Sequence, residues 1–266
     1  MSAIPLIENK SYDQPSLFEP LNLLREARRQ KKLADGTVPP LCVLDPDGDL
    51  AGYLQHSGRA SSNPHWACYH TQLLDFHLNG SSWGIVPYAV GAPFAVLVAE
   101  ELFAAGCRLL VSVTSAGQIA SLRKPPFFIL IERALRDEGA SYHYVPPARY
   151  AHLRPEFAAT LPPMLTRVSS PLEVGAVWTT DAPFRETQSA IDAAKAENLL
   201  AVEMEAAGLY ALAEAKHLAI VCFAHVTNQM GMVSGDFEKG AHNGAEACLD
   251  LLAAVSGWWQ SIHYDK

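Results

Sequence analysis

Short apolar runs with the length of buried strands alternate with helix-like segments along most of the chain. Residues 41–44, 108–113 and 218–225 are mostly apolar runs of this kind. Between the first two, residues 93–105 begin with Pro93 and are followed by Gly106, which typically open and end a helix. This alternation favours one α/β domain in which a sheet lies between layers of helices.

The remaining segments continue the same pattern. Residues 73–78 and 83–90 flank Asn79-Gly80, a strong signal for a β-hairpin. Residues 127–135, 156–168 and 174–180 alternate between strand-like and helix-like character. A strand at 199–202 is expected to lead through Glu203 into a helix ending at Lys216, and residues 239–258 are predicted to form the last helix.

The charge of the chain excludes one broad class of partner. Of its 266 residues, 49% are hydrophobic, and a chain of this size can bury roughly 75% of its unfolded surface. Twenty Lys and Arg residues stand against 28 Asp and Glu residues, so the formal charge is −8. No basic footprint for nucleic acid is present, and a small ligand is the expected partner.

The cysteines and the N-terminus indicate a cytoplasmic protein. The five cysteines are far apart and form no CxxC pair or zinc-type cluster, so we expect reduced thiols, no metal and no cofactor. Residues 1–15 carry Glu8, Lys10 and Asp13 where a signal peptide needs an apolar core. No uncharged apolar run of about 18 residues suggests a membrane span.

Residues 1–38 are predicted to be an N-terminal extension, followed by one domain over residues 39–266. Residues 21–33 place Leu21, Leu24 and Ala27 at helical spacing among five basic residues. A membrane-surface helix and a docked surface helix with a solvated basic side both fit this pattern. The short apolar stripe favours the docked helix.

Two segments at strand ends are candidates for ligand contact. The acidic turn Asp45–Asp49 follows the strand at 41–44, and α/β proteins bind ligands at such ends. Thr114–Gln118, a run of small residues, follows the strand at 108–113 and is expected to be a loop. Its N–H groups could face a ligand, although loops of this type are usually simple turns.

Four ordered segments resemble the purine and uridine phosphorylase family, which also contains nucleosidases. They are AVEMEAAGL (201–209), WTTDAPFRET (178–187), GCRLLVSVTSAGQI (106–119) and GAPFAVLVAEEL (91–102). The resemblance spans roughly residues 40–255. It implies a three-layer αβα domain with a central mixed β-sheet of the phosphorylase/hydrolase-like type, and a homo-oligomer in which neighbouring subunits complete the sites.

The resemblance implies a ribose site at the 201–209 segment. Glu205 would hold ribose hydroxyls, Met204 would pack on the sugar and Glu203 would assist. Cleavage of an N-glycosidic bond places positive charge on the sugar, which nearby carboxylates stabilise. The alternative is that both carboxylates only favour the N-terminus of the following helix, an effect of about 0.3–1 kcal/mol each.

The resemblance implies that the base lies near two further segments. Phe184 is placed to stack on the base and Arg185 to bind its edge, with Thr180 and residues Ser115, Ala116 and Gly117 completing the substrate site. Alternatively, Asp181 only caps a helix beginning at Pro183, and Arg185 and Glu186 pair with each other on the surface.

Asn228 stands where purine-acting members carry an Asp that protonates the leaving base. An amide can hydrogen-bond the base but cannot deliver that proton. Uridine phosphorylases also carry Asn here, yet their Gln-x-Arg pair has no counterpart after Asp181. The sequence therefore does not assign the base.

The residues that hold phosphate in the resembling family are replaced in this chain. The replaced positions fall on Leu44, Asp49, Ser112, Phe94 and a site near Tyr69 or His70. Acidic residues in place of arginines repel a dianion. We therefore predict hydrolysis, with Asp45, Asp47 or Asp49, and by preference Asp47, holding the attacking water.

The sequence is compatible with three functions. The first is hydrolysis of a nucleoside or related N-riboside. The second is phosphorolysis through an altered anion site built from loop N–H groups and His56, His65 or His70. The third is a nucleoside-binding relative without catalysis, in which the acidic turn is merely solvated.

Overall fold

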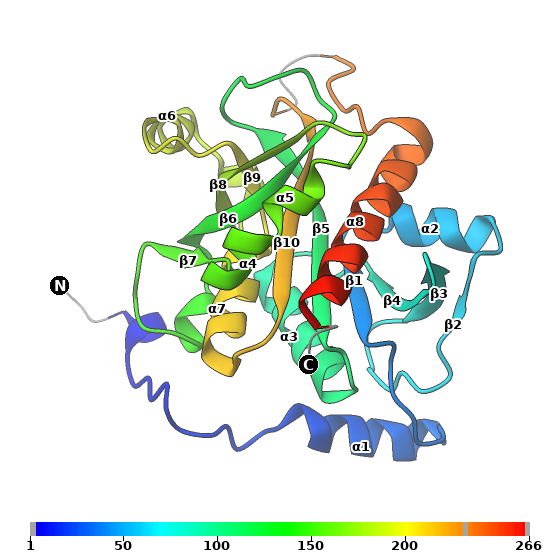
Figure 1. The fold of residues 1–266 in the computed structure, drawn as a ribbon. Helices are drawn as coiled ribbons and strands as arrows, with labels where there is room; N and C mark the ends of the chain where they lie inside the picture. Colours follow the sequence, from blue (N-terminus) through cyan, green and yellow to red (C-terminus); the bar gives the residue numbers. More distant parts are fainter. Residues whose placement is uncertain (1–3, 231–233, 264–266) are drawn as a thin grey trace.

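The computed structural model describes residues 4–230 and 234–263 of the chain. Strands of these residues join in one ten-stranded sheet (Figure 1). They are β1 (Leu41–Asp45), β2 (Ala60–Ser62), β3 (Leu74–Leu78), β4 (Ser81–Pro87), β5 (Leu109–Gln118), β6 (Phe127–Asp137), β7 (Tyr150–His152), β8 (Leu172–Thr180), β9 (Ala201–Glu203) and β10 (Ile220–Asn228).

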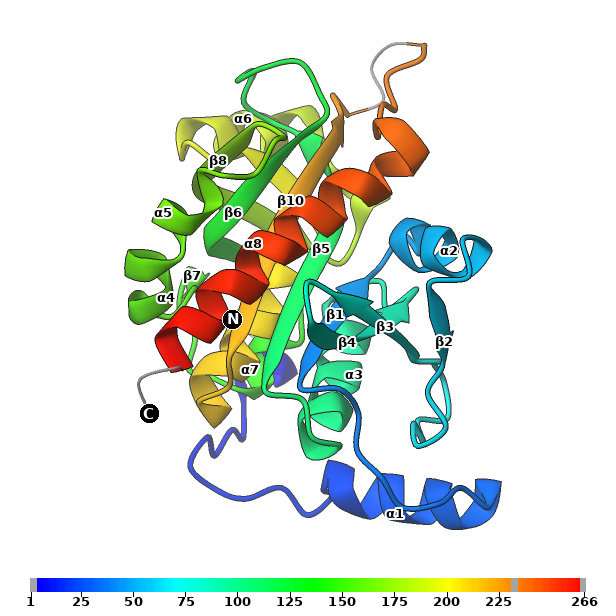
Figure 2. The ribbon, with the colours of Figure 1, turned by 45° about the vertical axis from the view of Figure 1, so that its right-hand side comes forward.

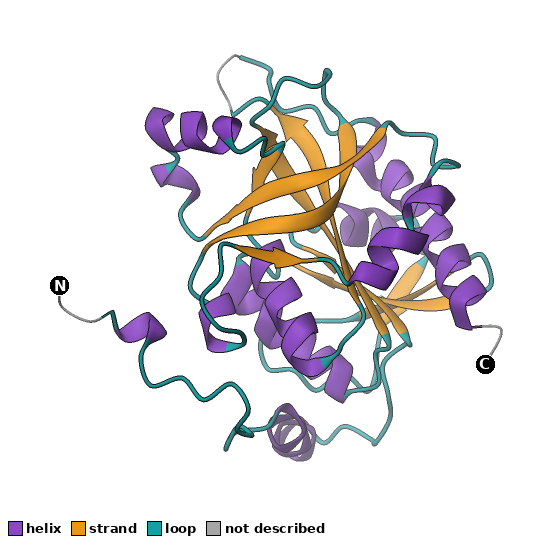
Figure 3. Cartoon of the chain, turned by 60° about the vertical axis from the view of Figure 1, so that its left-hand side comes forward, coloured by secondary structure: helices purple, strands orange, loops and turns teal. Residues whose placement is uncertain are grey.

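The described helices cover both faces of this sheet. The α-helices are α1 (Pro20–Lys31), α2 (Asp49–His56), α3 (Ala92–Ala104), α4 (Pro155–Thr160), α5 (Pro162–Leu165), α6 (Gln188–Ala196), α7 (Ala206–Lys216) and α8 (Ala245–His263). Short 3₁₀ turns are η1 (Pro5–Ile7), η2 (Ser141–His143), η3 (Pro183–Arg185) and η4 (Ala241–Gly244). In Figure 2, α8 crosses one face of the sheet, whereas α3 and α7 lie behind the strands. The predicted α/β architecture with helices on either side of a mixed sheet is confirmed (Figure 3).

The sheet is mixed and half of it is closed. Its order is β10-β6-β8-β9-β5-β1-β4-β3-β2, and β7 pairs with β6. Because β10 also pairs with β5, the strands β5, β10, β6, β8 and β9 form a ring. Within this ring β10 runs parallel to β5, whereas β9 runs antiparallel to it. The end of β10 and the start of β9 therefore lie beside the same end of β5.

Burial explains why the apolar runs become strands. Every residue of β1 is buried, as are eight of the nine residues of β10. Strands covered by helices on both faces need such continuous apolar runs. The hairpin prediction is also confirmed, because Asn79 and Gly80 connect β3 to β4 with φ values of 48° and 79°.

Three local expectations were wrong. Thr114–Gln118 is not a loop but the second half of β5, because it pairs with β10 and β9 there. The last helix begins at Ala245 rather than at Lys239, since His242 and Asn243 adopt left-handed backbone conformations. A short 3₁₀ turn, η3, does begin at Pro183, but its N-cap residue is Ala182 rather than Asp181, and no side chain caps it.

The N-terminal helix docks on the body of the protein. In α1, Leu24 and Ala27 are buried and join the same apolar core as the strands. Arg25 and Arg29 of this helix are exposed, whereas Arg28 and Lys31 donate to the backbone carbonyls of His65 and Cys68 on the body of the protein. The predicted boundary at residue 38 remains a prediction. None of the helices in the described part of the chain is long and apolar enough to cross a membrane.

Candidate active site

Four strands bring the predicted site residues to one place. In the parallel registers, Leu44 of β1 lies beside Ser112 of β5, and Asn228 of β10 lies beside Gly117. The antiparallel partner β9 places Val202 beside the same Gly117. The segment after β9 therefore runs back toward Thr114 and meets the turn after β1.

The acidic turn begins with a buried carboxyl. Asp45 is 6% exposed and its Oδ2 accepts the N–H of Ala51 at 2.8 Å, near the start of α2. Burial raises the pKa of Asp45 to about 7, against the opposing effect of the Ala51 N–H. Gly48 follows with φ of 77°, and a Cβ there would meet the ring of Tyr88. The buried Asp45 side chain therefore fixes the turn to the start of α2.

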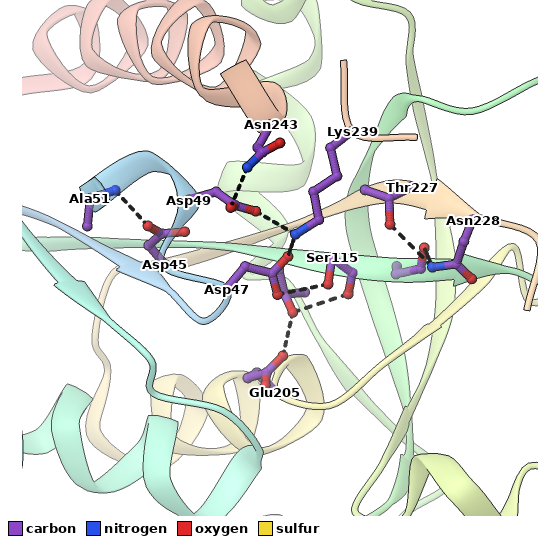
Figure 4. Close-up of polar contacts among 12 residues, drawn as sticks. Asp45, Asp47, Asp49, Ala51, Ser115, Glu205, Thr227, Asn228, Lys239 and Asn243 are labelled. Atoms are coloured by element: carbon purple, nitrogen blue, oxygen red, sulfur yellow. Dashed lines mark hydrogen bonds and ion pairs between the residues drawn. The ribbon is translucent and has the colours of Figure 1, made fainter. Parts of the chain in front are cut away.

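The two other carboxylates of the turn share one ammonium group. Lys239 Nζ donates to Oδ2 of both Asp47 and Asp49 (Figure 4). Oδ1 of Asp47 accepts from Ser115 Oγ at 2.9 Å, and Oδ1 of Asp49 accepts from Asn243 Nδ2 at 3.1 Å. The structure thus joins the predicted residues Asp47 and Ser115 in one hydrogen-bonded network.

Glu205 is held by the residue next to Ser115. Its Oε2 accepts from Thr114 Oγ1 at 2.7 Å, and its Oε1 accepts from the N–H of Gly91 at 2.6 Å. Since an ionised carboxylate has about four acceptor positions, capacity for ribose hydroxyls remains. Glu205 is only 1% exposed, so a sugar could contact its carboxylate only if neighbouring residues moved aside.

Glu203 lies behind Glu205 and organises the start of α7. Its Oε2 accepts the N–H groups of Glu205 and Ala206, each at 2.8 Å, and its Oε1 accepts from Thr179 Oγ1. Burial and then the neighbouring Glu205 raise the pKa of Glu203. Burial likewise raises the pKa of Glu205. This arrangement matches the helix-terminus interpretation for Glu203 and favours a positioning role.

Asn228 lies at the end of β10, over the small residues of β5. Its Nδ2 donates to Thr227 Oγ1 at 3.2 Å and lies 3.5 Å from the carbonyl of Ala116. A Cβ on Gly117 would lie 3.2 Å from Asn228 Oδ1. Ala116 and Gly117 therefore set the position of the Asn228 amide. Met204, which stands between Glu203 and Glu205 in the sequence, is half-buried.

The 178–187 segment is less closely connected to this network. Thr180 Oγ1 accepts the N–H of Ala182, and Asp181 accepts the N–H of Gly139. The Phe184 side chain is 99% exposed, and Arg185 is exposed as well. The structure therefore does not join Phe184 or Arg185 to the Asp47 and Glu205 network, and their contact with a base remains a prediction.

None of the replaced phosphate positions is a lysine or an arginine. Ser112 is buried, and Tyr69, His70 and Phe94 line a cavity of about 570 Å³ together with Tyr88 and one cationic side chain, that of Lys31. Among the described residues, no three His, Cys, Asp or Glu side chains are grouped to hold a metal ion.

Sequence reasoning missed two members of the site. Thr114, the partner of Glu205, belongs to a run of small residues for which the sequence predicts a loop. Lys239 lies at the start of the segment 239–258, for which the sequence predicts a helix, although its side chain completes the network around Asp47. No local pattern marks either residue, because each partner lies far away in the sequence.

Comparisons with known proteins assign the chain to a family. Residues 51–256 match the model of the phosphorylase superfamily, and the chain belongs to that family. A guanosine phosphorylase of Halorubrum lacusprofundi is 26% identical over 193 residues, covering 70% of this chain and 80% of the relative. An uncharacterised protein of Acanthamoeba polyphaga mimivirus is 25% identical over 184 residues, covering 67% of this chain and 69% of the relative.

Solved structures with low identity share the fold. Uridine phosphorylase of Vibrio fischeri superimposes with a TM-score of 0.68 at 19% identity, covering 83% of this chain and 90% of the other. Purine nucleoside phosphorylase of Toxoplasma gondii, in complex with immucillin-H, gives a TM-score of 0.70 at 14% identity, covering 84% and 93%.

Proposed function

We propose that this protein cleaves the N-glycosidic bond of a nucleoside or related N-riboside by hydrolysis. The bond from the anomeric carbon to the base nitrogen breaks, and its electron pair leaves with the base. Water forms the new bond to the anomeric carbon and passes its proton to the Asp47 carboxylate. The leaving base accepts a hydrogen bond from the Asn228 amide and takes its proton from solvent.

One observation carries this proposal. Consecutive residues of β5, Thr114 and Ser115, hydrogen-bond Glu205 and Asp47 respectively. Burial raises the pKa of Glu205 and the charge of Asp47 adds to the rise, so a carboxylate suited to ribose hydroxyls lies within electrostatic range of a carboxylate suited to holding water. Both can stabilise the positive charge that develops on the sugar.

Phosphorolysis is the second candidate. It is supported by the relative named guanosine phosphorylase, which also suggests a purine nucleoside as substrate. Against it stand Asp47 and Asp49, which occupy the turn where an incoming phosphate would need cations. A nucleoside-binding protein without catalysis is the third candidate.

The experiment is a nucleoside panel with and without inorganic phosphate. Guanosine, inosine, adenosine and uridine are incubated with the protein, and the base, ribose and ribose 1-phosphate are quantified. We expect release of base and ribose at the same rate in both arms. Strict dependence on phosphate with ribose 1-phosphate as product would establish phosphorolysis instead.

Two substitutions assign the roles. Asp47→Asn should lower kcat by about 10²–10⁴-fold, the usual contribution of a general base. Glu205→Gln should lower kcat/KM, while Asp13→Asn on the exposed N-terminal segment should leave both parameters unchanged. Ligand-induced thermal stabilisation without any turnover would favour the non-catalytic candidate.

The proposal includes a homo-oligomeric assembly in the cytoplasm. The five cysteines, Cys42, Cys68, Cys107, Cys222 and Cys248, are buried free thiols, which suits a reducing compartment. Light scattering should give a mass that is a multiple of 28.9 kDa. A monomer at all concentrations would remove the oligomer from the proposal.

A further inference from the structure

Lys239 is built into the acidic turn rather than exposed beside it. Its ammonium group bridges Asp47 and Asp49, and the second oxygen of each carboxylate is bound by Ser115 or Asn243 (Figure 4). About a quarter of each of the three charged side chains is exposed. Within the described residues, Lys239 is the one lysine or arginine that pairs with this turn.

We infer that Lys239 determines which acceptor the site uses, because its ion pairs with Asp47 and Asp49 exclude anions and leave neutral water as the acceptor. This inference rests on the proposed function, in which the acceptor lies beside Asp47. Two of the three N–H donors of the ammonium group already go to Asp47 and Asp49. An anion that took over these two donors would have to displace the carboxylates, and one that used only the third donor would lie beside both.

The charges around the turn oppose such a displacement. Two carboxylates and one ammonium carry a net negative charge, and the buried Asp45 adds to it when ionised. A dianion beside Asp49 would be repelled, and breaking the pair would leave partly buried carboxylates without their counter-ion.

The neighbouring imidazole does not replace Lys239 as a cation. His225 lines a cavity of about 290 Å³ together with Lys239, and its ring stacks on Phe128 with centroids 4.6 Å apart. Burial, followed by the charge of Lys239, lowers the pKa of His225 to about 4. The ring is therefore neutral near pH 7, and anion binding would depend on Lys239 itself.

Phosphate binding without nucleoside tests the inference directly. Binding of inorganic phosphate is measured by calorimetry for the wild type, Asp49→Asn, Lys239→Met and the double variant Asp49→Asn/Lys239→Met. We expect negligible binding at millimolar phosphate for the wild type. Asp49→Asn should bind phosphate at least tenfold more tightly, and the double variant should lose that gain.

Two further variants test whether a change in phosphate binding comes from a general loss of charge or from misfolding. Asp13→Asn removes the same charge from the N-terminal segment and should not change phosphate binding. If thermal unfolding shows that Asp49→Asn is not folded, Asp49→Ser takes its place with the same expected gain.

Two outcomes would overturn the inference. Wild-type phosphate binding that Lys239→Met abolishes would make Lys239 a phosphate ligand. An unchanged affinity in folded Asp49→Asn or Asp49→Ser would show that the ion pairs do not exclude anions. Because no turnover is measured, failure of the protein to cleave nucleosides would refute the proposed function without deciding this test.

Discussion

The buried Asp45 carboxyl makes the free energy of unfolding depend on pH. In the folded protein burial raises its pKa to about 7, whereas the ordinary aspartate value is 3.8. The folded state therefore binds a proton more tightly than the unfolded chain does. The stability that Asp45 contributes is fully present below about pH 4 and is lost as the pH rises through about 7.

Asp45→Asn should remove this pH dependence. The amide is neutral at every pH, and its oxygen can still accept the N–H of Ala51. Urea unfolding at pH 5 and pH 8 should show that the variant gains on the wild type at the higher pH, by at most about 3 kcal/mol. Asp13→Asn, at an exposed aspartate, serves as the control. Parallel stability curves for Asp45→Asn and the wild type would contradict the prediction.

The contact between α3 and α7 sets the position of Glu205. Gly208 of α7 packs directly on α3, and a Cβ there would lie 2.9 Å from the Cβ of Ala92. Gly91 precedes α3 and donates its N–H to Glu205, which precedes α7. The spacing of the two helices therefore controls the geometry of the predicted ribose carboxylate.

Gly208→Ala should be destabilising although alanine is the better helix former. The propensity gain is about 1 kcal/mol, but the clash is with Ala92, a side chain that cannot rotate away. We expect a net loss of about 1–2 kcal/mol in urea unfolding and weaker nucleoside binding. The matched control is Gly257→Ala in α8, where a Cβ meets nothing within 4 Å and stability should rise. Equal effects of the two substitutions would refute this account.

At the scale of the whole molecule, the N-terminal helix shares the core of the domain. Leu24 is 2% exposed and belongs to the apolar cluster that includes the strands, whereas Leu21 in the same helix is 63% exposed. Because α1 and these strands pack in the same apolar cluster, we expect them to unfold together. The extension would then be part of the folding unit despite its position outside the sheet.

Leu24→Ala should therefore weaken the entire protein. Removing a buried leucine side chain costs about 2–5 kcal/mol, and the loss should appear in a single transition with an unchanged denaturant slope. Leu21→Ala should stay within about 0.5 kcal/mol of the wild type. A separate early transition in Leu24→Ala would instead show that α1 unfolds independently.

Much of the fold and part of the site follow from the sequence. The apolar runs predicted β1, β10 and the start of β5, and Asn79-Gly80 predicted the hairpin, because burial and turn conformation are local requirements. The motif around Glu205 located the candidate ribose site. The second half of β5 was missed, since small residues become a strand there only through pairing with β9 and β10.

The α/β class, the shortage of basic residues and the clustering of carboxylates after β1 all follow from local sequence patterns. The partners of those carboxylates are set by the folded chain. Lys239 lies 192 residues from Asp47 along the chain and reaches it because β1 and β10 flank β5 on either side. Composition can count charges, but which of them neutralise one another depends on long-range strand pairing that no local pattern encodes.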